Sequence, residues 1–322
     1  MQTQALQSKH TRYSPLLEVA PDVACRQLSI VNVFLVGEPG ARDRSWALVD
    51  TGLGTSVEAI QQAAGERFGP ARPAAIILTH GHFDHVGSAR RLAEMWGAPI
   101  YAHRLEMPYL TGRSDYPPPD PTVGGGAVAT LGSRFFPKSG TDLQPWVEPL
   151  PEDGTVPGMP GWRWIHTPGH TPGHVALFRD ADRTLIAGDA FVTTRQESFL
   201  SVMTRRQEVW RPPAYFTPDW EAARRSVQEL AALRPNVAGT GHGVPMFGES
   251  LRQQLDNLAT NFDEYIPDDG RYVRQPALAD ERGLVMVPPP VRDALPFLLA
   301  AGAAVALGAV FARGRVRASR GY

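Results

Sequence analysis

The sequence predicts a layered α/β fold, because short apolar strand segments alternate with amphipathic helical segments over most of the chain. Two further observations agree: the first strand segment is rich in β-branched residues, and several strands run directly into glycine-rich loops. The expected strands are 28–36, 46–50, 74–78, 99–102, 162–165, 175–178, 184–187 and 236–238. The expected helices are 55–68, 88–96, 219–233 and 249–264.

Local signals set the ends of these elements. The first strand, 28–36, stops at the Gly- and Pro-rich run 37–40, which cannot continue a regular strand. Helix 55–68 has apolar residues at helical spacing, and the Thr-Ser pair at its start supplies the expected N-cap. The acidic run 180–182 between two strands predicts a hairpin turn.

The chain divides into segments of different composition. Residues 107–148 are rich in Pro and Gly, so we expect a long inserted loop of the kind that covers or lines a binding site. The expected segments are an N-terminal segment (1–27), a folded domain (28–264), a Pro-rich linker (265–293), a candidate transmembrane helix (294–312) and a basic tail (313–322).

Charge and cysteine content exclude several classes of protein. The 322 residues carry 32 Lys and Arg against 33 Asp and Glu, and this net charge of −1 argues against a nucleic-acid partner. The single cysteine, Cys25, excludes an intramolecular disulfide framework and a cysteine-based zinc finger. The N-terminal residues lack the apolar stretch of a secretory signal peptide. We therefore expect a globular protein that acts on a small molecule.

Four potential metal ligands fall within six residues directly after the expected strand 74–78. They belong to the run His-Gly-His-Phe-Asp-His at 80–85. Alternate side chains of an extended chain share a face, so His80 and His82 can point at one ion. After a turn, Asp84 and His85 can reach a second ion. Imidazole nitrogen and carboxylate oxygen are ligands that suit zinc, iron or manganese.

Three further candidate ligands follow later strands. His170, Asp189 and His242 each lie in a glycine-rich loop, where the backbone can approach an ion closely. Together with the first four they supply five imidazoles and two carboxylates, enough for two ions that share one carboxylate and one water. His166 and His174 flank His170 at four residues on either side, and from spacing alone either can replace it.

In this order, the run Val-Asp-Thr-Gly at 49–52, the 80–85 run and the three later ligands resemble the metallo-β-lactamase-fold hydrolase superfamily, which includes glyoxalase II-like and lactonase-like hydrolases. The resemblance implies a four-layer αββα sandwich, here followed by the C-terminal hydrophobic helix. It assigns His80, His82 and His170 to one ion and Asp84, His85 and His242 to the other. Asp189 would bridge the ions. Asp50 and His174 would support the ligands through hydrogen bonds.

The activity that the resemblance implies is hydrolysis by a hydroxide activated between two metal ions, with zinc expected and iron or manganese as alternatives. Asp84 is the expected catalytic residue, because it can orient the nucleophile or carry a proton. An ester, thioester or lactone is the expected substrate, and Tyr215 and the pair Arg205-Arg206 are candidates for contact with an anionic group. A phosphodiesterase or nuclease, and a single-iron oxygenase similar to persulfide dioxygenases, are the alternatives.

The run 294–312 contains no charged residue. A helix of this length spans about 28 Å at 1.5 Å per residue, which is close to the thickness of a bilayer core. The run therefore predicts membrane contact, with a helix docked on the folded domain as the alternative. The expected location is cytoplasmic, or anchored to a membrane by this helix.

Overall fold

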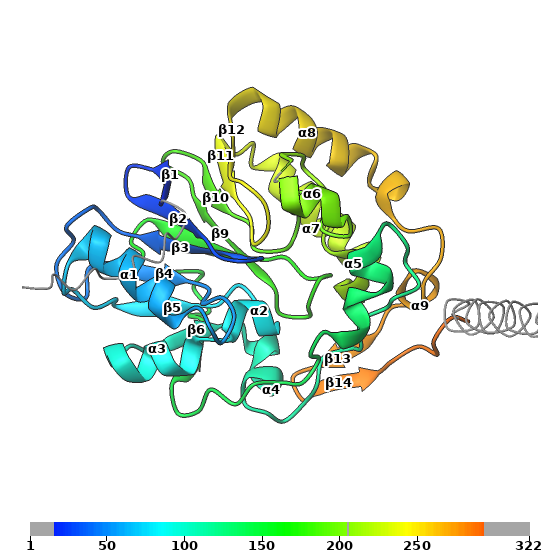
Figure 1. The fold of residues 1–322 in the computed structure, drawn as a ribbon, viewed down its shortest axis with the longest axis horizontal. Helices are drawn as coiled ribbons and strands as arrows, with labels where there is room; N and C mark the ends of the chain where they lie inside the picture. The colour runs from blue at the N-terminus through cyan, green and yellow to red at the C-terminus, as the bar shows by residue number, and fades with distance from the viewer. Residues whose placement is uncertain (1–15, 205, 293–322) are drawn as a thin grey trace, which may run out of the picture. The chain divides into compact units, whose positions relative to one another are not determined.

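Two β-sheets form the centre of the molecule (Figure 1). The computed structural model describes residues 16–204 and 206–292, and those up to Pro288 belong to one compact unit. The first sheet contains, in spatial order, β1 (Leu17–Ala20), β2 (Val23–Gln27), β3 (Asn32–Val36), β4 (Ala47–Val49), β5 (Ala75–Ile77), β6 (Ile100–Ala102) and β7 (Val147–Pro149). The second contains β12 (Met246–Phe247), β11 (Val237–Gly239), β10 (Thr184–Ile186), β9 (Val175–Arg179) and β8 (Trp162–His166).

Neighbouring strands of the first sheet are antiparallel in its N-terminal part and parallel where helices connect them. Strands β1 to β4 are antiparallel. Strands β4 to β7 are parallel, and crossovers that contain α1 (Val57–Phe68) and α3 (Ala89–Trp96) join β4 to β5 and β5 to β6. In the second sheet β10 and β11 are parallel across helix α7 (Trp220–Ala232), and α8 (Gly248–Thr260) follows β12.

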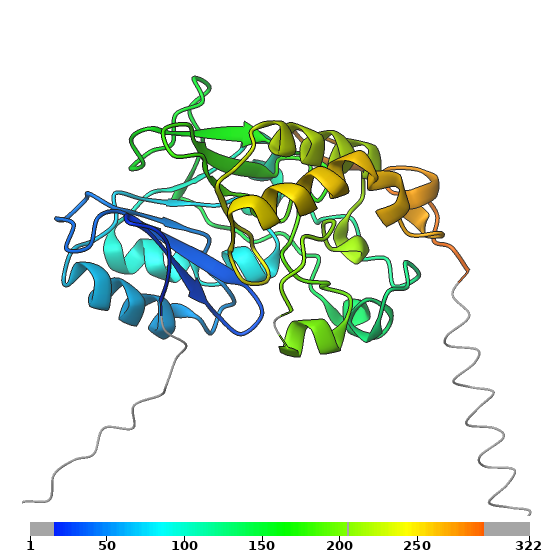
Figure 2. The same ribbon diagram turned by 90° about the horizontal axis from the view of Figure 1, so that it is seen from above.

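Successive side chains of a strand serve different layers. On β3, Leu35 packs in a cluster with residues of α1 and α3, while its neighbour Phe34 packs between the two sheets. On β10, Leu185 packs with residues of α7 and α8, while Ile186 joins the cluster between the sheets. Because side chains alternate across a strand, each sheet carries helices on its outer face and the other sheet on its inner face. The predicted αββα sandwich is confirmed (Figures 1 and 2).

The first predicted strand differs most from the structure. Residues 28–31 form a turn, closed by a hydrogen bond from Leu28 N to Val31 O at 2.9 Å, and the strand begins at Asn32. This turn is needed because β2 and β3 pair along their whole length and the chain must reverse between them. The expected N-terminal segment, 1–27, contains β1 and β2, which extend the first sheet.

The Pro- and Gly-rich segment 107–148 is not structureless. It contains α4 (Met107–Leu110), α5 (Ala127–Thr130) and the short 3-10 helix η2 (Gly132–Phe135). It also follows η1 (Arg104–Glu106) without a break.

Residues 265–288, expected to be part of a linker, also carry regular structure. They follow η4 (Phe262–Tyr265) and form α9 (Arg271–Arg274) and a hairpin of β13 (Leu278–Asp280) and β14 (Gly283–Met286). Tyr272 Oη donates a hydrogen bond to Pro118 O at 2.6 Å, and Leu284 N donates to Ser114 Oγ at 3.0 Å. These contacts tie residues 272 and 284 to the 107–148 region, so this part of the expected linker packs on the folded unit, which ends at Pro288.

The expected transmembrane helix (294–312) and basic tail (313–322) lie outside the described residues. Within residues 16–204 and 206–292, no helix combines the length and the apolar character that crossing a membrane requires.

Candidate metal centre

The seven candidate ligands come from four loops that meet in space. His80 and His82 follow β5, and Asp84 and His85 lie on the short helix α2 (Phe83–Val86) that continues the same loop. The other three candidates follow β8, β10 and β11. The ligand atoms form three overlapping sets, in each of which all atoms lie within 4.8 Å of one another: His80, His82 and His170; His80, His85 and Asp189; Asp84, His85 and His242. Folding thus brings together residues more than 150 positions apart.

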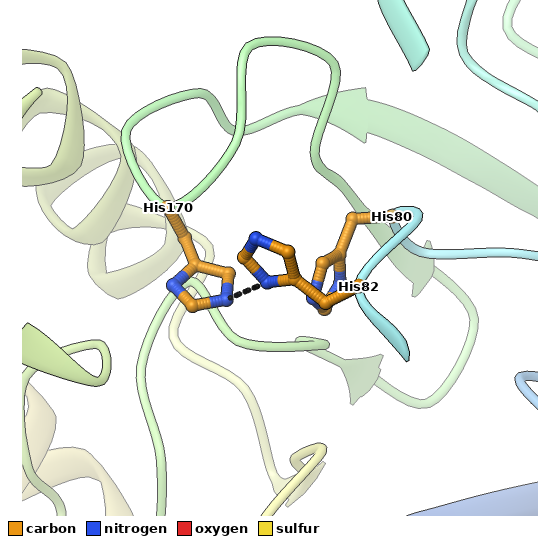
Figure 3. A group of neighbouring side chains, drawn as sticks. All are labelled: His80, His82 and His170. Atoms are coloured by element: carbon orange, nitrogen blue, oxygen red, sulfur yellow. Dashed lines mark hydrogen bonds between the residues drawn. The ribbon is translucent and has the colours of Figure 1, made fainter. Parts of the chain in front are cut away.

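The first set consists of imidazoles alone (Figure 3). His82 Nδ1 lies 3.0 Å from His170 Nε2. The ring of His80 lies 4.8 Å from that of His82 and 4.9 Å from that of His170, centre to centre. Three ring nitrogens therefore converge on one point.

Asp189 connects the sets. Its Oδ2 atom lies 3.1 Å from His242 Nε2 and 3.5 Å from His170 Nε2. Its Oδ1 atom lies 3.7 Å from His85 Nε2. The carboxylate thus contacts one imidazole of the first set and two of the third. The sequence-based assignment of a bridging role is consistent with this position.

Unpaired polar atoms show that the cluster fits a cation. Among the described residues, the buried atoms without a hydrogen-bond partner include His80 Nε2, His85 Nε2, His170 Nδ1 and Asp189 Oδ1. Leaving such groups unpaired in the interior is unfavourable. All four residues belong to the sets that can hold a metal ion, and a divalent cation accepts lone pairs from both imidazole and carboxylate.

Electrostatics favours the ligand forms of His80, His82, His170 and Asp189. Burial, together with the neighbouring imidazoles, holds the pKa of His80 and of His170 well below the ordinary value and lowers the pKa of His82 to about 3. Burial raises the pKa of Asp189, but His242 and His85 outweigh it and hold that pKa well below its usual range. Neutral imidazoles and an ionised carboxylate are the forms that bind metal.

Burial lowers the pKa of His85 and of His242, but the neighbouring carboxylates outweigh it. Asp50 and Asp189 hold the pKa of His85 well above its ordinary value. Asp189 and Asp84 raise the pKa of His242.

Asp50 and Thr79 hold the first ligand loop by hydrogen bonds to the ring nitrogens that face away from the cluster. Asp50 accepts hydrogen bonds from the backbone nitrogen and the hydroxyl of Thr79, both at 2.8 Å, and its Oδ2 lies 2.8 Å from His85 Nδ1. Thr79 Oγ1 lies 3.1 Å from His80 Nδ1. In both histidines one ring nitrogen is therefore occupied by the protein, and the other, Nε2, faces the cluster.

The three histidines between 166 and 174 have different surroundings. His170 is the one found in a candidate set. His174 Nε2 accepts a hydrogen bond from Asp189 N at 2.9 Å, so it positions the backbone of the bridging residue. His166 Nε2 lies 2.8 Å from Pro172 O, and its ring stacks on His103. The structure thus distinguishes His170, which lies in a candidate set, from His174 and His166, which do not, a choice that spacing alone left open.

Sequence reasoning missed Glu106. This carboxylate is fully buried and accepts four hydrogen bonds from two ligand loops and the 107–148 region. Its donors are Gly81 N at 2.9 Å, Gly173 N at 2.8 Å, Thr171 Oγ1 at 2.8 Å and Tyr116 Oη. Glu106 therefore links the loop of His80 and His82 to the loop of His170. Nothing local in the sequence marks it, because its donors lie 10 to 67 residues away.

A cavity of about 460 Å³ opens beside the cluster. Five of the candidate ligands line it: His82, Asp84, His170, Asp189 and His242. Tyr215, which the sequence singled out for substrate contact, also lines the cavity. Arg206 lies on the surface near Glu208, and Arg205 lies outside the described residues. The cluster is thus accessible to a molecule bound in the cavity.

A layered αββα fold with a potential metal-binding His/Asp cluster beside a cavity defines the class of protein. The model of the metallo-beta-lactamase superfamily matches residues 26–242. The chain therefore belongs to the metallo-β-lactamase superfamily, and the sequence-based resemblance is confirmed.

Relatives within the superfamily are similar over most of the domain. The probable metallo-hydrolase YflN of Bacillus subtilis is 47% identical over 243 residues, which are 75% of this chain and 91% of the relative. The probable metallo-hydrolase YybB of the same organism is 36% identical over 150 residues, 47% of this chain and 59% of the relative. A beta-lactamase domain protein from Burkholderia ambifaria has a similar fold, with a TM-score of 0.53 and 20% identity over 80% of this chain and 76% of that one.

Proposed function

We propose that the chain is a metal-dependent hydrolase of ester, thioester or lactone bonds that uses two divalent cations, preferably zinc. The observation that carries the proposal is the overlap of the three ligand sets, which gives room for two adjacent ions. His80, His82 and His170 would hold one ion, Asp84, His85 and His242 the other, and Asp189 would lie between them. The relatives described as probable metallo-hydrolases support hydrolysis.

When bound, such cations supply Lewis acidity toward a carbonyl oxygen and make hydroxide available from water near neutral pH. The residues of the chain provide the remaining parts of the reaction. Asp84 both lines the cavity and lies 3.6 Å, through Oδ2, from His242 Nε2. Its carboxylate is therefore placed to orient the attacking water, to accept its proton and to deliver that proton to the leaving group.

The cavity favours a carbonyl substrate over a phosphodiester. Among the described residues that line it, none is a lysine or an arginine, and two are acidic. A phosphodiester keeps its negative charge during hydrolysis, and in this cavity only the two cations would balance that charge, because no lysine or arginine of the described lining supports them. A neutral ester or lactone has no such requirement.

Metal reconstitution combined with a substrate panel tests the proposal. Metal-free full-length protein is titrated with zinc, iron or manganese, and hydrolysis of an ester, a thioester, a lactone and a phosphodiester is measured at each step. We expect activity on the carbonyl substrates to saturate at two ions per chain. Full activity at one ion would contradict the two-ion site, and activity on the phosphodiester alone would contradict the substrate class.

Variants of Asp189 connect this activity to the cluster. Asp189→Asn keeps the size of the side chain but removes the negative charge between the two sets. We expect bound metal to fall below two ions per chain and turnover to fall by about two orders of magnitude. Asp153→Asn alters an exposed carboxylate outside the cluster and should leave both quantities unchanged.

A further inference from the structure

The cavity beside the metal centre has mainly apolar walls away from the ligands. Four aromatic side chains form much of the wall, namely Phe83, Phe136, Tyr215 and Phe216. Their rings contact one another: Phe136 lies 5.8 Å from Phe83, 5.6 Å from Tyr215 and 5.9 Å from Phe216, centre to centre. Phe216 also packs on the ligand His82, with ring centres 4.5 Å apart. The apolar wall is thus continuous with the metal centre.

The apolar surface extends from the cavity to solvent. Leu131, which follows α5, and Phe199 and Met203, on α6 (Phe199–Thr204), line the cavity and are 49%, 62% and 66% exposed. Phe199 and Met203 are four residues apart on the helix and therefore lie on one face. Large apolar side chains are seldom left this exposed in a cluster unless the surface binds something.

The cavity opens to solvent between α5 and α6, and this opening is called the mouth. Hydrogen bonds beneath the surface link its two walls. Val128 N of α5 donates a hydrogen bond to Glu197 O at 3.2 Å. The Glu197 side chain accepts one from Arg211 Nη1 at 2.6 Å and one from Ala214 N at 2.9 Å, and both charged side chains are buried. This buried carboxylate, hydrogen-bonded to both a guanidinium and a backbone N–H, fixes the spacing of the walls. The mouth is therefore a built feature of the fold, and α5 and α6 lie close together on the same side of the molecule (Figure 2).

We infer that the substrate of this site carries an extended, neutral apolar chain on its carbonyl group, which lies along the aromatic wall and leaves between α5 and α6. The inference rests on the proposed hydrolase function. The volume of about 460 Å³ is in the range of cavities that bury most of a small ligand. Away from the candidate ligands the described lining offers no lysine or arginine, so a negatively charged group on the chain would be buried there without a partner.

A homologous series of esters measures the effect of chain length. The full-length, metal-loaded protein is tested with the 4-nitrophenyl esters of acetate, butyrate, hexanoate, octanoate and decanoate. Each methylene group that becomes buried should raise kcat/KM by up to about fourfold until the cavity is filled. A matched ester with a terminal carboxylate should be hydrolysed more slowly than the neutral ester of the same length.

Binding of non-hydrolysable carbonyl compounds separates this inference from the proposed function. Calorimetry with straight-chain methyl ketones of increasing length reports chain binding without turnover. Affinity that rises with length while no ester is hydrolysed would overturn the proposed function and support the cavity assignment. Hydrolysis and binding that are both independent of chain length would overturn the inference and leave the hydrolase in place.

Two serine variants locate the binding surface. Phe199→Ser and Met203→Ser replace exposed side chains at the mouth, so neither removes core packing. Both should reduce the rise in kcat/KM and in affinity per methylene group for the longer esters and ketones. Phe247→Ser, at a residue that is 51% exposed and outside the cavity lining, is the matched control. An equal loss in the control, or no loss in the two mouth variants, would overturn the assignment.

Discussion

Oδ2 of Asp50 lies 2.8 Å from Nδ1 of His85, and this contact sets the direction in which the imidazole presents its other nitrogen. With Nδ1 engaged, Nε2 of His85 faces Asp189 at 3.7 Å. Asp50 itself has a φ of 59°, in the left-handed region that non-glycine residues seldom adopt. The residue that orients a candidate ligand is therefore held in an unfavourable backbone conformation.

Asp50→Asn should weaken metal binding. Asparagine tolerates the left-handed conformation, so the backbone is retained, but its neutral amide accepts a weaker hydrogen bond from His85. We expect metal affinity to fall about 10- to 100-fold in a chelator competition titration. Asp43→Asn, at an exposed carboxylate paired with Arg72, should leave the affinity unchanged. Equal affinities for both variants would contradict the role given to Asp50.

Alanine variants of the three neighbouring histidines should lose different amounts of bound metal, according to the contacts that each ring makes. His170→Ala removes a candidate ligand and should cause the largest loss of bound metal. His174→Ala removes the acceptor of the Asp189 backbone N–H and should cause a smaller loss. His166→Ala should retain the metal, because its ring contacts Pro172 and His103. Elemental analysis after dialysis measures the order, and greater loss from His174→Ala than from His170→Ala would mean that the ligand is misassigned.

Glu106→Gln should destabilise the fold and loosen the metal centre. Glutamine keeps one acceptor oxygen, but its NH₂ group faces donors that the carboxylate now satisfies. Each buried donor left unpaired costs about 1–3 kcal/mol. We expect a lower free energy of unfolding in urea and lower metal affinity. Glu94→Gln, on the exposed side of α3, is the control, and equal stability of the two variants would rule out the linking role of Glu106.

Two glycine-to-alanine variants should have different effects, one on the metal centre and one on the stability of helix α1. A Cβ at Gly241 would lie 2.1 Å from Asp189 Oδ1 and 2.7 Å from His85 Cε1, so Gly241→Ala should displace both side chains and lower metal content. A Cβ at Gly65, within α1, meets no atom within 4 Å. Gly65→Ala should therefore raise the free energy of unfolding by about 0.5–1 kcal/mol. Unchanged metal content in Gly241→Ala would show that the loop can move away.

The stability of the protein should depend on pH through His103. Burial, with smaller contributions from His166 and Arg104, lowers the pKa of His103 to about 4. Between pH 6.5 and 4 the unfolded chain binds a proton at this residue and the folded protein does not, so stability falls as the pH falls through this window. Above pH 6.5 the residue is neutral in both states and has no effect.

His103→Asn isolates this contribution. His103 Nδ1 accepts a hydrogen bond from Leu105 N at the start of η1, and asparagine can make the same cap. The difference in unfolding free energy between the variant and the natural protein should be flat above pH 6.5. Below it, the variant should gain up to about 1.4 kcal/mol per pH unit, the value for one proton. A difference that does not change with pH would show that His103 titrates normally.

Local patterns in the sequence were enough to predict the layers and the candidate ligands. Apolar periodicity placed α1 and α7 within two residues of their observed bounds, because it records which side of an element is buried. The 80–85 run identified its four candidate ligands because they lie on one short loop, where residues that are close in sequence are also close in space. The strands β1 and β2 escaped notice, since they are short and include charged residues such as Glu18 and Arg26.

Tertiary structure alone decided the contacts between distant parts of the chain. It distinguished His170 from His174, showed Glu106 accepting hydrogen bonds from two loops, and brought Leu131 and Phe199 to one cavity. It also packed residues 265–288 against the 107–148 region. Periodicity and motifs report only the local environment of each residue. Which groups meet across the sheets depends on how the layers stack, and that is fixed by the burial of the whole set of apolar side chains at once.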